Sequence, residues 1–88
     1  MKYEVTFSAA ASRQIKKLPP DLRINLIALA ETLAANPRPS GVVKLEGDDN
    51  AYRIRFRNYR IVYEIYDDKL IVVVIKVGHR RNVYRSQL

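Results

Sequence analysis

Arginine recurs at alternate positions of one short stretch, at Arg53, Arg55 and Arg57, and Arg60 follows just after Asn58. In a β-strand alternate side chains point to the same face, so the first three arginines would share one face and their apolar neighbours the other. A guanidinium group stays protonated, and its planar fork matches the oxygens of a phosphate group. The spacing therefore predicts a cationic strand face that binds a polyphosphate.

A two-residue turn at Arg57 and Asn58 would place Arg55 directly opposite Arg60 in a hairpin. Like charges that face each other in a sheet are unfavourable by up to about 1 kcal/mol, so we expect a bound anion to offset this pair. A solvated basic surface is the alternative interpretation of the same pattern. The register contains three further pairs: Phe56 with Tyr59, Ile54 with Ile61, and Arg53 with Val62.

The segment after the last apolar run holds a second group of polar side chains: His79, Arg80, Arg81, Tyr84 and Arg85. Cleavage of an RNA backbone by transesterification requires activation of a 2′-OH, stabilisation of a charged phosphorane and a proton for the leaving 5′ oxygen. Arg80 suits the charge, His79 suits proton transfer, and Tyr84 can hydrogen-bond or stack on a base. A partner-binding end of the chain with a structural histidine is the alternative.

The elements that must position these residues follow from the apolar periodicity. Residues 2–7 alternate apolar and polar side chains, which predicts a strand, and Ser8 follows as an N-cap for a helix. This helix ends before Pro19, and a second helix is expected over residues 20–35. Both have an apolar face, so we expect a helical hairpin that covers one face of a sheet.

Strands are then predicted over residues 51–56, 59–66 and 70–77. The length of the turn between the last two strands is left open. A three-residue turn would place Arg60 opposite Lys76, and Val72 would then share a face with the arginines. A two-residue turn would exchange the two faces of the last strand.

Together these elements predict one α+β domain over residues 1–88, with a small, mainly antiparallel sheet and the helical hairpin packed on one face. The order is strand, helix, helix, then three strands. The connector over residues 37–50 is rich in proline and glycine and has room for one extra short strand.

The composition is that of a folded, soluble domain: 88 residues, 48% hydrophobic, with a formal net charge of +7 that favours an anionic partner. The chain has no cysteine, and its acidic pairs Asp48-Asp49 and Asp67-Asp68 lack histidine or cysteine at metal-ligand spacing. The N-terminus lacks the pattern of a signal peptide, and the longest apolar run, Leu70 to Ile75, is far too short to span a membrane. We therefore expect a cytoplasmic protein with no cofactor, no metal and no membrane segment.

Five short motifs occur in order along nearly the whole chain: Lys44-Leu45-Glu46-Gly47, Tyr52-Arg53-Ile54-Arg55, Tyr59-Arg60-Ile61-Val62-Tyr63, Val77-Gly78-His79-Arg80-Arg81 and Val83-Tyr84-Arg85. This ordered set resembles the RelE/ParE toxin superfamily, and more closely its RelE branch. The resemblance implies a ribosome-dependent endoribonuclease toxin that cuts mRNA in the ribosomal A site by 2′-OH attack. It also implies a metal-free reaction that leaves a 2′,3′-cyclic phosphate and a 5′-OH, and a cognate antitoxin that neutralises the toxin.

Matched motif by motif, the resemblance assigns five residues to the catalytic site: Arg53, Arg55, Arg60, Arg80 and Tyr84. Two departures leave the proton acceptor open. Arg53 and Arg55 stand where the best-studied branch has lysines, and an arginine cannot give up its proton as a lysine can. Glu46 stands where that branch has an arginine, so Glu46 and His79 are the titratable candidates, and a largely electrostatic mechanism is the alternative.

Four further basic residues are predicted to bind RNA: Lys44, Arg57, Arg81 and Arg85. Two rival functions remain. A ParE-like protein would share the fold but inhibit DNA gyrase, and a non-catalytic basic domain would block translation by occupying ribosomal RNA.

Overall fold

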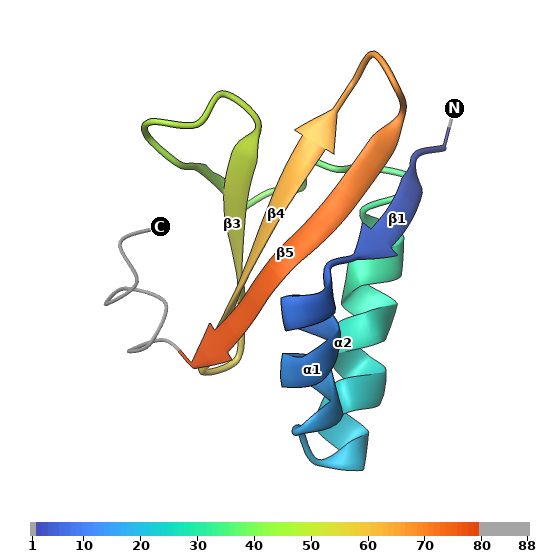
Figure 1. Ribbon diagram of the computed structural model, residues 1–88, viewed down its shortest axis with the longest axis vertical. Helices are drawn as coiled ribbons and strands as arrows, with labels where there is room; N and C mark the ends of the chain where they lie inside the picture. Colours follow the sequence, from blue (N-terminus) through green and yellow to red (C-terminus); the bar gives the residue numbers. More distant parts are fainter. Residues whose placement is uncertain (1, 80–88) are drawn as a thin grey trace.

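The computed structural model describes residues 2–79 and contains two helices and one five-stranded sheet (Figure 1). The elements, in chain order, are β1 (Glu4–Phe7), α1 (Ala9–Lys16), α2 (Pro20–Thr32), β2 (Val43–Lys44), β3 (Ala51–Phe56), β4 (Tyr59–Tyr66) and β5 (Ile71–His79). The predicted α+β class is confirmed, and the short extra strand is present as β2.

The sheet has the strand order β1-β5-β4-β3-β2. Strands β2 to β5 pair in antiparallel fashion, while β1 and β5, the first and last strands of the chain, pair in parallel. The sheet is therefore mixed, with one parallel pair at an edge. Parallel strands need a long connection between them. Here the helical hairpin and strands β2 to β4 lie between β1 and β5 in the chain.

Helix α1 begins where the sequence predicts, because the Oγ of Ser8 accepts a hydrogen bond from the backbone nitrogen of Ala11 at 3.0 Å. Helix α2 ends at Thr32, three residues before its predicted end at residue 35. The N–H groups of Leu33, Ala34 and Ala35 each bond the carbonyl three residues earlier. This bonding makes a tighter last turn, and the buried Pro37 follows it.

Strand β5 extends past the end of β1 (Figure 1). Ser8 and Gln14 bind the edge that this leaves. The backbone N–H of Ser8 donates to the carbonyl of Val74, and its hydroxyl donates to the carbonyl of Ile75 at 2.9 Å. Further along, the backbone N–H of Val77 donates to Oε1 of Gln14 at 2.6 Å. The helix thus covers a strand edge that would otherwise expose unpaired backbone groups.

The hydrophobic core lies between the helical hairpin and one face of the sheet. It contains the buried side chains Ala11, Ile15, Leu18, Leu26, Ala30, Leu33, Ile54, Ile61, Tyr63, Ile65, Val72, Val74 and Val77. Among the described residues, no helix is long and apolar enough to cross a bilayer.

The register of the β3–β4 hairpin is the predicted one: Arg55 lies opposite Arg60, and all three further pairs are observed. The turn at Arg57 and Asn58 has two residues, with Arg57 at φ 55°.

The β4–β5 turn has four residues, 67–70, so Tyr66 pairs with Ile71 and the side chains of Val72 and Val74 face the helices. Neither of the two turn lengths that the sequence left open is observed, and Arg60 does not lie opposite Lys76. A β-bulge shifts the register between Val62 and Tyr63, and Arg60 lies opposite Gly78.

Candidate nucleic-acid interface

The sheet face opposite the helical hairpin carries Arg53, Arg55 and Arg60, and we call it the arginine face. Register places Arg55 and Arg60 side by side on neighbouring strands, and Arg53 opposite Val62 two residues along. In an antiparallel pair, residues directly opposite each other have Cα atoms about 4.5–5.5 Å apart. The hairpin therefore concentrates three positive charges on one face at the end nearest its turn.

Burial differs sharply among these arginines. Arg55 is exposed and Arg53 is half-buried, whereas Arg60 is only 6% exposed and is the one buried charged residue among those described. Its Nη1 donates to the carbonyl of Tyr59 at 3.4 Å. A buried charge is tolerated only where neighbouring groups satisfy it, so the surrounding fold holds this guanidinium in place.

Arg57 extends the positive charge to the tip of the hairpin. It is exposed in the turn, and its guanidinium carbon lies 5.7 Å from the centre of the Phe56 ring. Its side chain is open to the solvent.

A hollow of about 220 Å³ lies on the arginine face. Val62, which pairs with Arg53, lines this hollow, and so do the acidic residues Glu46 and Asp48. The complete lining is Leu45, Glu46, Gly47, Asp48, Ala51, Val62 and Ile75. Glu46, one of the two candidate proton acceptors, is thus on the same side of the sheet as the arginines.

The structure separates two predicted site residues from the arginine face. His79 pairs with Tyr59, and their rings meet edge to face with centres 5.7 Å apart. Because the neighbouring pair of Arg60 and Gly78 points to the arginine face, His79 lies on the helix side. Lys44 pairs with Tyr52 and also lies on the helix side.

The predicted catalytic residues Arg80 and Tyr84 and the predicted RNA-binding residues Arg81 and Arg85 lie outside the described residues. The structure therefore assembles the strand arginines with Glu46 on one face, and the catalytic roles of all these residues stay predictions. Across residues 2–79, no group of three or more histidine, cysteine, aspartate or glutamate side chains is placed to hold a metal ion.

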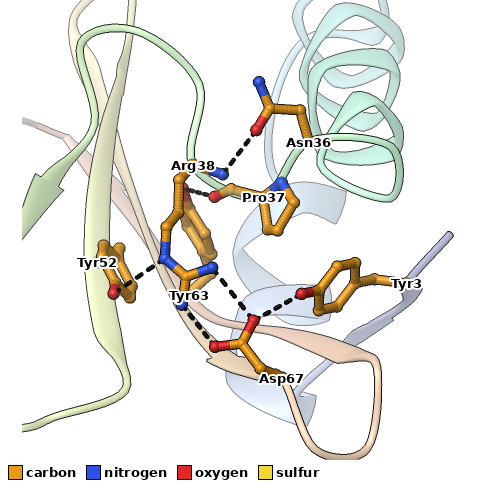
Figure 2. Close-up of polar contacts among 7 residues, drawn as sticks. All are labelled: Tyr3, Asn36, Pro37, Arg38, Tyr52, Tyr63 and Asp67. Carbon is orange, nitrogen blue, oxygen red and sulfur yellow. Dashed lines mark hydrogen bonds and ion pairs between the residues drawn. The ribbon is translucent and has the colours of Figure 1, made fainter. Parts of the chain in front are cut away.

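A polar network at the far end of the sheet was missed by the sequence analysis (Figure 2). Arg38 forms a two-bond ion pair with Asp67, at 3.1 Å and 2.8 Å, and its Nε donates to the Tyr52 hydroxyl at 3.2 Å. The Tyr3 hydroxyl donates to the same Asp67 carboxylate at 2.6 Å. No local sequence signal could reveal this network, because its partners are 29 and 64 residues apart.

The pKa values of two groups at this end of the sheet are shifted. Hydrogen bonds from Arg38 and Tyr3 stabilise the charged carboxylate and lower the pKa of Asp67 from 3.8 to about 2. Burial of the Tyr63 hydroxyl, which donates to the carbonyl of Pro37 at 2.7 Å, raises the pKa of Tyr63 to about 12. These groups hold the connector after α2 against β4 and the β4–β5 turn, and so support the sheet from the end away from the arginines.

Comparison with known proteins agrees with the fold. The family model described as ParE toxin of type II toxin-antitoxin system, parDE, matches residues 5–84. The chain is 34% identical to the mRNA interferase toxin RelE of Escherichia coli, over 91% of this chain and 85% of that protein. It is 31% identical to toxin RelG of Mycobacterium tuberculosis, over 97% of this chain and 99% of that protein.

Solved structures show the same architecture. The archaeal RelE–RelB complex from Pyrococcus horikoshii matches with a TM-score of 0.81 at 25% identity, covering 91% of this chain and 97% of that chain. A mutant of E. coli toxin RelE in the free state matches with a TM-score of 0.81 at 30% identity, covering 99% of this chain and 93% of that chain. The fold is that of a small bacterial and archaeal toxin class. The chain belongs to the RelE/ParE toxin superfamily, and the relatives named above place it with the RelE toxins.

Proposed function

We propose that this protein is a ribosome-dependent endoribonuclease toxin that inhibits translation by cutting mRNA in the ribosomal A site. The observation that carries the proposal is the opposed pair Arg55 and Arg60 with Arg53 beside it on one sheet face. Such a cluster suits the charge of a phosphodiester backbone. The name mRNA interferase, given to a relative at 34% identity, supports the reaction class.

In the proposed reaction the 2′ oxygen loses its proton and attacks the adjacent phosphorus. The bond from phosphorus to the 5′ oxygen breaks, and the 5′ oxygen takes up a proton from water. Arg60, held rigidly by its burial, stabilises the charge that develops on the phosphorane, while Arg53 and Arg55 hold neighbouring phosphate oxygens. The products are a 2′,3′-cyclic phosphate and a 5′-OH. No step requires a metal ion.

The proton of the 2′-OH needs an acceptor, and we assign this role to Glu46. Glu46 lines the hollow on the arginine face, whereas His79 lies on the other side of the sheet. By family resemblance Arg80 and Tyr84 complete the site, with Tyr84 contacting the nucleotide and Arg80 adding positive charge.

A cognate antitoxin is the proposed protein partner. The P. horikoshii relative was solved in complex with RelB, and the E. coli and M. tuberculosis relatives were also solved as toxin–antitoxin complexes. With a net charge of +7, this chain suits a partner with acidic side chains.

Inhibition of DNA gyrase is the second candidate function, because the matching family model is that of ParE. The test is to add the purified protein to ribosomes programmed with a defined mRNA and to map 5′ ends by primer extension. We expect cuts at fixed positions of the A-site codon, with poor cleavage of free mRNA. Intact mRNA together with inhibited gyrase supercoiling would replace the ribonuclease with the gyrase function.

Arg60→Ala is the informative variant in this assay, and Arg13→Ala is its matched control. Arg13 is exposed on α1, lines none of the hollows described here, and its loss changes the net charge equally. The proposal predicts that cleavage disappears only in Arg60→Ala.

A further inference from the structure

The β-bulge in β5 gives the arginine face one further cation, Lys76. Ile75 lines the hollow on this face, so strict alternation would turn the next residue, Lys76, toward the helices. The bulge interrupts the alternation at this point. Val62 pairs with Arg53 on β3 and with Lys76 on β5, and the three side chains therefore share the arginine face.

Lys76 lies diagonally across from the buried Arg60. Arg60 pairs with Gly78, two residues beyond Lys76, in the regular part of the β4–β5 ladder. Diagonal neighbours of this kind have Cα atoms about 7–8 Å apart, a separation that long side chains can bridge. Arg53 is the diagonal neighbour of Arg60 on the other side. A phosphate bound over Arg60 would thus have Arg53 on its β3 side and Lys76 on its β5 side.

The ammonium group of Lys76 is available to a ligand. The residue is half-buried, and Val62, the residue opposite it, is apolar and fully buried. Within residues 2–79, no hydrogen bond or ion pair engages this ammonium group. Charged groups that are partly removed from water are normally paired, so an oxygen of a bound substrate would supply the partner that the fold does not.

Lysine differs from arginine in one respect that matters on this face. An ammonium group can give up a proton, whereas a guanidinium group in a protein cannot. The described strands contain two lysines, and the other one, Lys44, lies on the helix side. Lys76 is therefore the strand cation on the arginine face whose chemistry allows it to act as an acid.

We propose that Lys76 is the general acid of the cleavage reaction and donates a proton to the leaving 5′ oxygen. As the bond from phosphorus to the 5′ oxygen breaks, an N–H bond of the ammonium group breaks, its electron pair stays on nitrogen, and an O–H bond forms. The neutral amine then regains a proton from water, so water is the overall source of the proton. This role rests on the proposed ribonuclease function, whereas the position of Lys76 rests on the register alone.

The proton donor and the proton acceptor are then separate groups, as an in-line displacement requires. Glu46 lies in the loop between β2 and β3, and Lys76 lies on β5. The strand order places these elements on either side of β4, which carries Arg60.

The test compares two mRNAs on programmed ribosomes in single-turnover reactions. One has an ordinary phosphodiester at the mapped cut position, and the other has sulfur in place of the bridging 5′ oxygen there. A thiolate leaves readily without a proton, because thiols are far more acidic than alcohols. An enzyme that lacks its general acid should therefore still cut the sulfur mRNA.

The informative variant is Lys76→Met, and its control is Lys17→Met, which removes an equal charge from an exposed position at the end of α1. We expect Lys76→Met to cut the ordinary mRNA about 10²-fold more slowly than the wild type and the sulfur mRNA at the wild-type rate. Lys76→Arg keeps the charge but cannot give up a proton, so it should behave like Lys76→Met. Lys17→Met should match the wild type on both mRNAs.

Three results would overturn the proposal. The first is a rate for Lys76→Met on the ordinary mRNA within twofold of the wild type. The second is an equal loss on both mRNAs, which would mean that Lys76 binds the phosphate or supports the fold. The third is a wild-type rate for Lys76→Arg on the ordinary mRNA, which would mean that only the charge is needed.

Failure of this role is distinguishable from failure of the proposed function. If the wild type cuts neither mRNA, the ribonuclease is wrong, and the general acid is wrong with it. If the wild type cuts both and Lys76→Met cannot be told from Lys17→Met, the ribonuclease stands and only the role of Lys76 is wrong.

Discussion

Arg60, which is buried, is the residue on which the proposed chemistry depends most. Removal of one fixed donor from a charge-stabilising site typically slows a reaction about 10²- to 10³-fold. We expect a loss of this size in the single-turnover cleavage rate of Arg60→Ala on ribosomes. Arg60→Lys keeps the charge but loses the planar fork, so it should restore only part of the rate. A rate for Arg60→Ala within twofold of the wild type would contradict the assigned role.

The assignment of the proton acceptor to Glu46 and its assignment to His79 predict opposite results. If Glu46 accepts the 2′-OH proton, Glu46→Gln should slow cleavage about 10²-fold and remove the rise of the rate with pH, because an amide cannot take up a proton. His79→Gln should keep the shape of the profile, since His79 lies on the helix side of the sheet. Single-turnover rates measured over a range of pH decide between them. The assignment fails if His79→Gln, and not Glu46→Gln, flattens the profile.

At the scale of elements, the ion pair of Asp67 with Arg38 links the β4–β5 turn to the connector after α2 (Figure 2). Folding lowers the pKa of Asp67 from 3.8 to about 2, so the stabilisation is fully present above about pH 4 and is lost as the pH falls toward 2. Asp67→Asn should therefore reduce the free energy of unfolding at pH 7, and the gap to the wild type should narrow between pH 4 and pH 2. Urea unfolding at several pH values measures this gap. A gap that is equally large at pH 7 and pH 2 would show that the carboxylate charge is not its cause.

Tyr63 joins β4 to the same connector through one buried hydrogen bond, from its hydroxyl to the carbonyl of Pro37. Tyr63→Phe leaves that carbonyl without its partner and should cost about 1–3 kcal/mol. For a domain of this size each kcal/mol lowers the melting temperature by roughly 4–8 °C, so a drop of several degrees is expected. Tyr66→Phe is the matched control, because the Tyr66 hydroxyl bonds only the partly exposed Glu64. Equal melting temperatures for the two variants would contradict a specific role for Tyr63.

The two hairpins show which registers a sequence can specify. The β3–β4 register was predictable because β3 alternates strictly, with Ile54 on one face and Arg53 and Arg55 on the other, so a slip by one residue would bury arginines. Strand β5 is apolar on both faces, with Val72 and Val74 toward the helices and Ile71 and Val73 away from them, so no such penalty fixes its register. The four-residue turn and the bulge then decide the outcome.

At the scale of the whole molecule, the fold and the arginine cluster could be predicted, but the distribution of the other site residues over the two faces could not. Periodicity and proline positions locate the helices and strands, because each depends on local sequence. The side of the sheet on which His79 lies depends on the bulge, which is a tertiary feature. The network of Arg38 with Asp67 depends on contacts across most of the chain.

The two faces of the sheet differ in chemistry. One carries the three arginines and the hollow lined by Glu46 and Asp48, and the other packs against the helical hairpin. With a net charge of +7, the whole molecule attracts polyanions, and the arginine face is the surface proposed to hold RNA. A site made mainly of arginines would stabilise charge well but offer few groups that accept a proton, which suits the proposed dependence on the ribosome to orient the substrate.

The most direct test of the proposed function uses ribosomes programmed with an mRNA that carries a single 2′-deoxy nucleotide at the mapped cut position. The all-ribose mRNA should be cut to products that end in a 2′,3′-cyclic phosphate and begin with a 5′-OH. The deoxy mRNA should stay intact at that position, because the attacking 2′ oxygen is missing. Equal cleavage of both mRNAs, or cleavage of neither, would contradict 2′-OH attack on the arginine face.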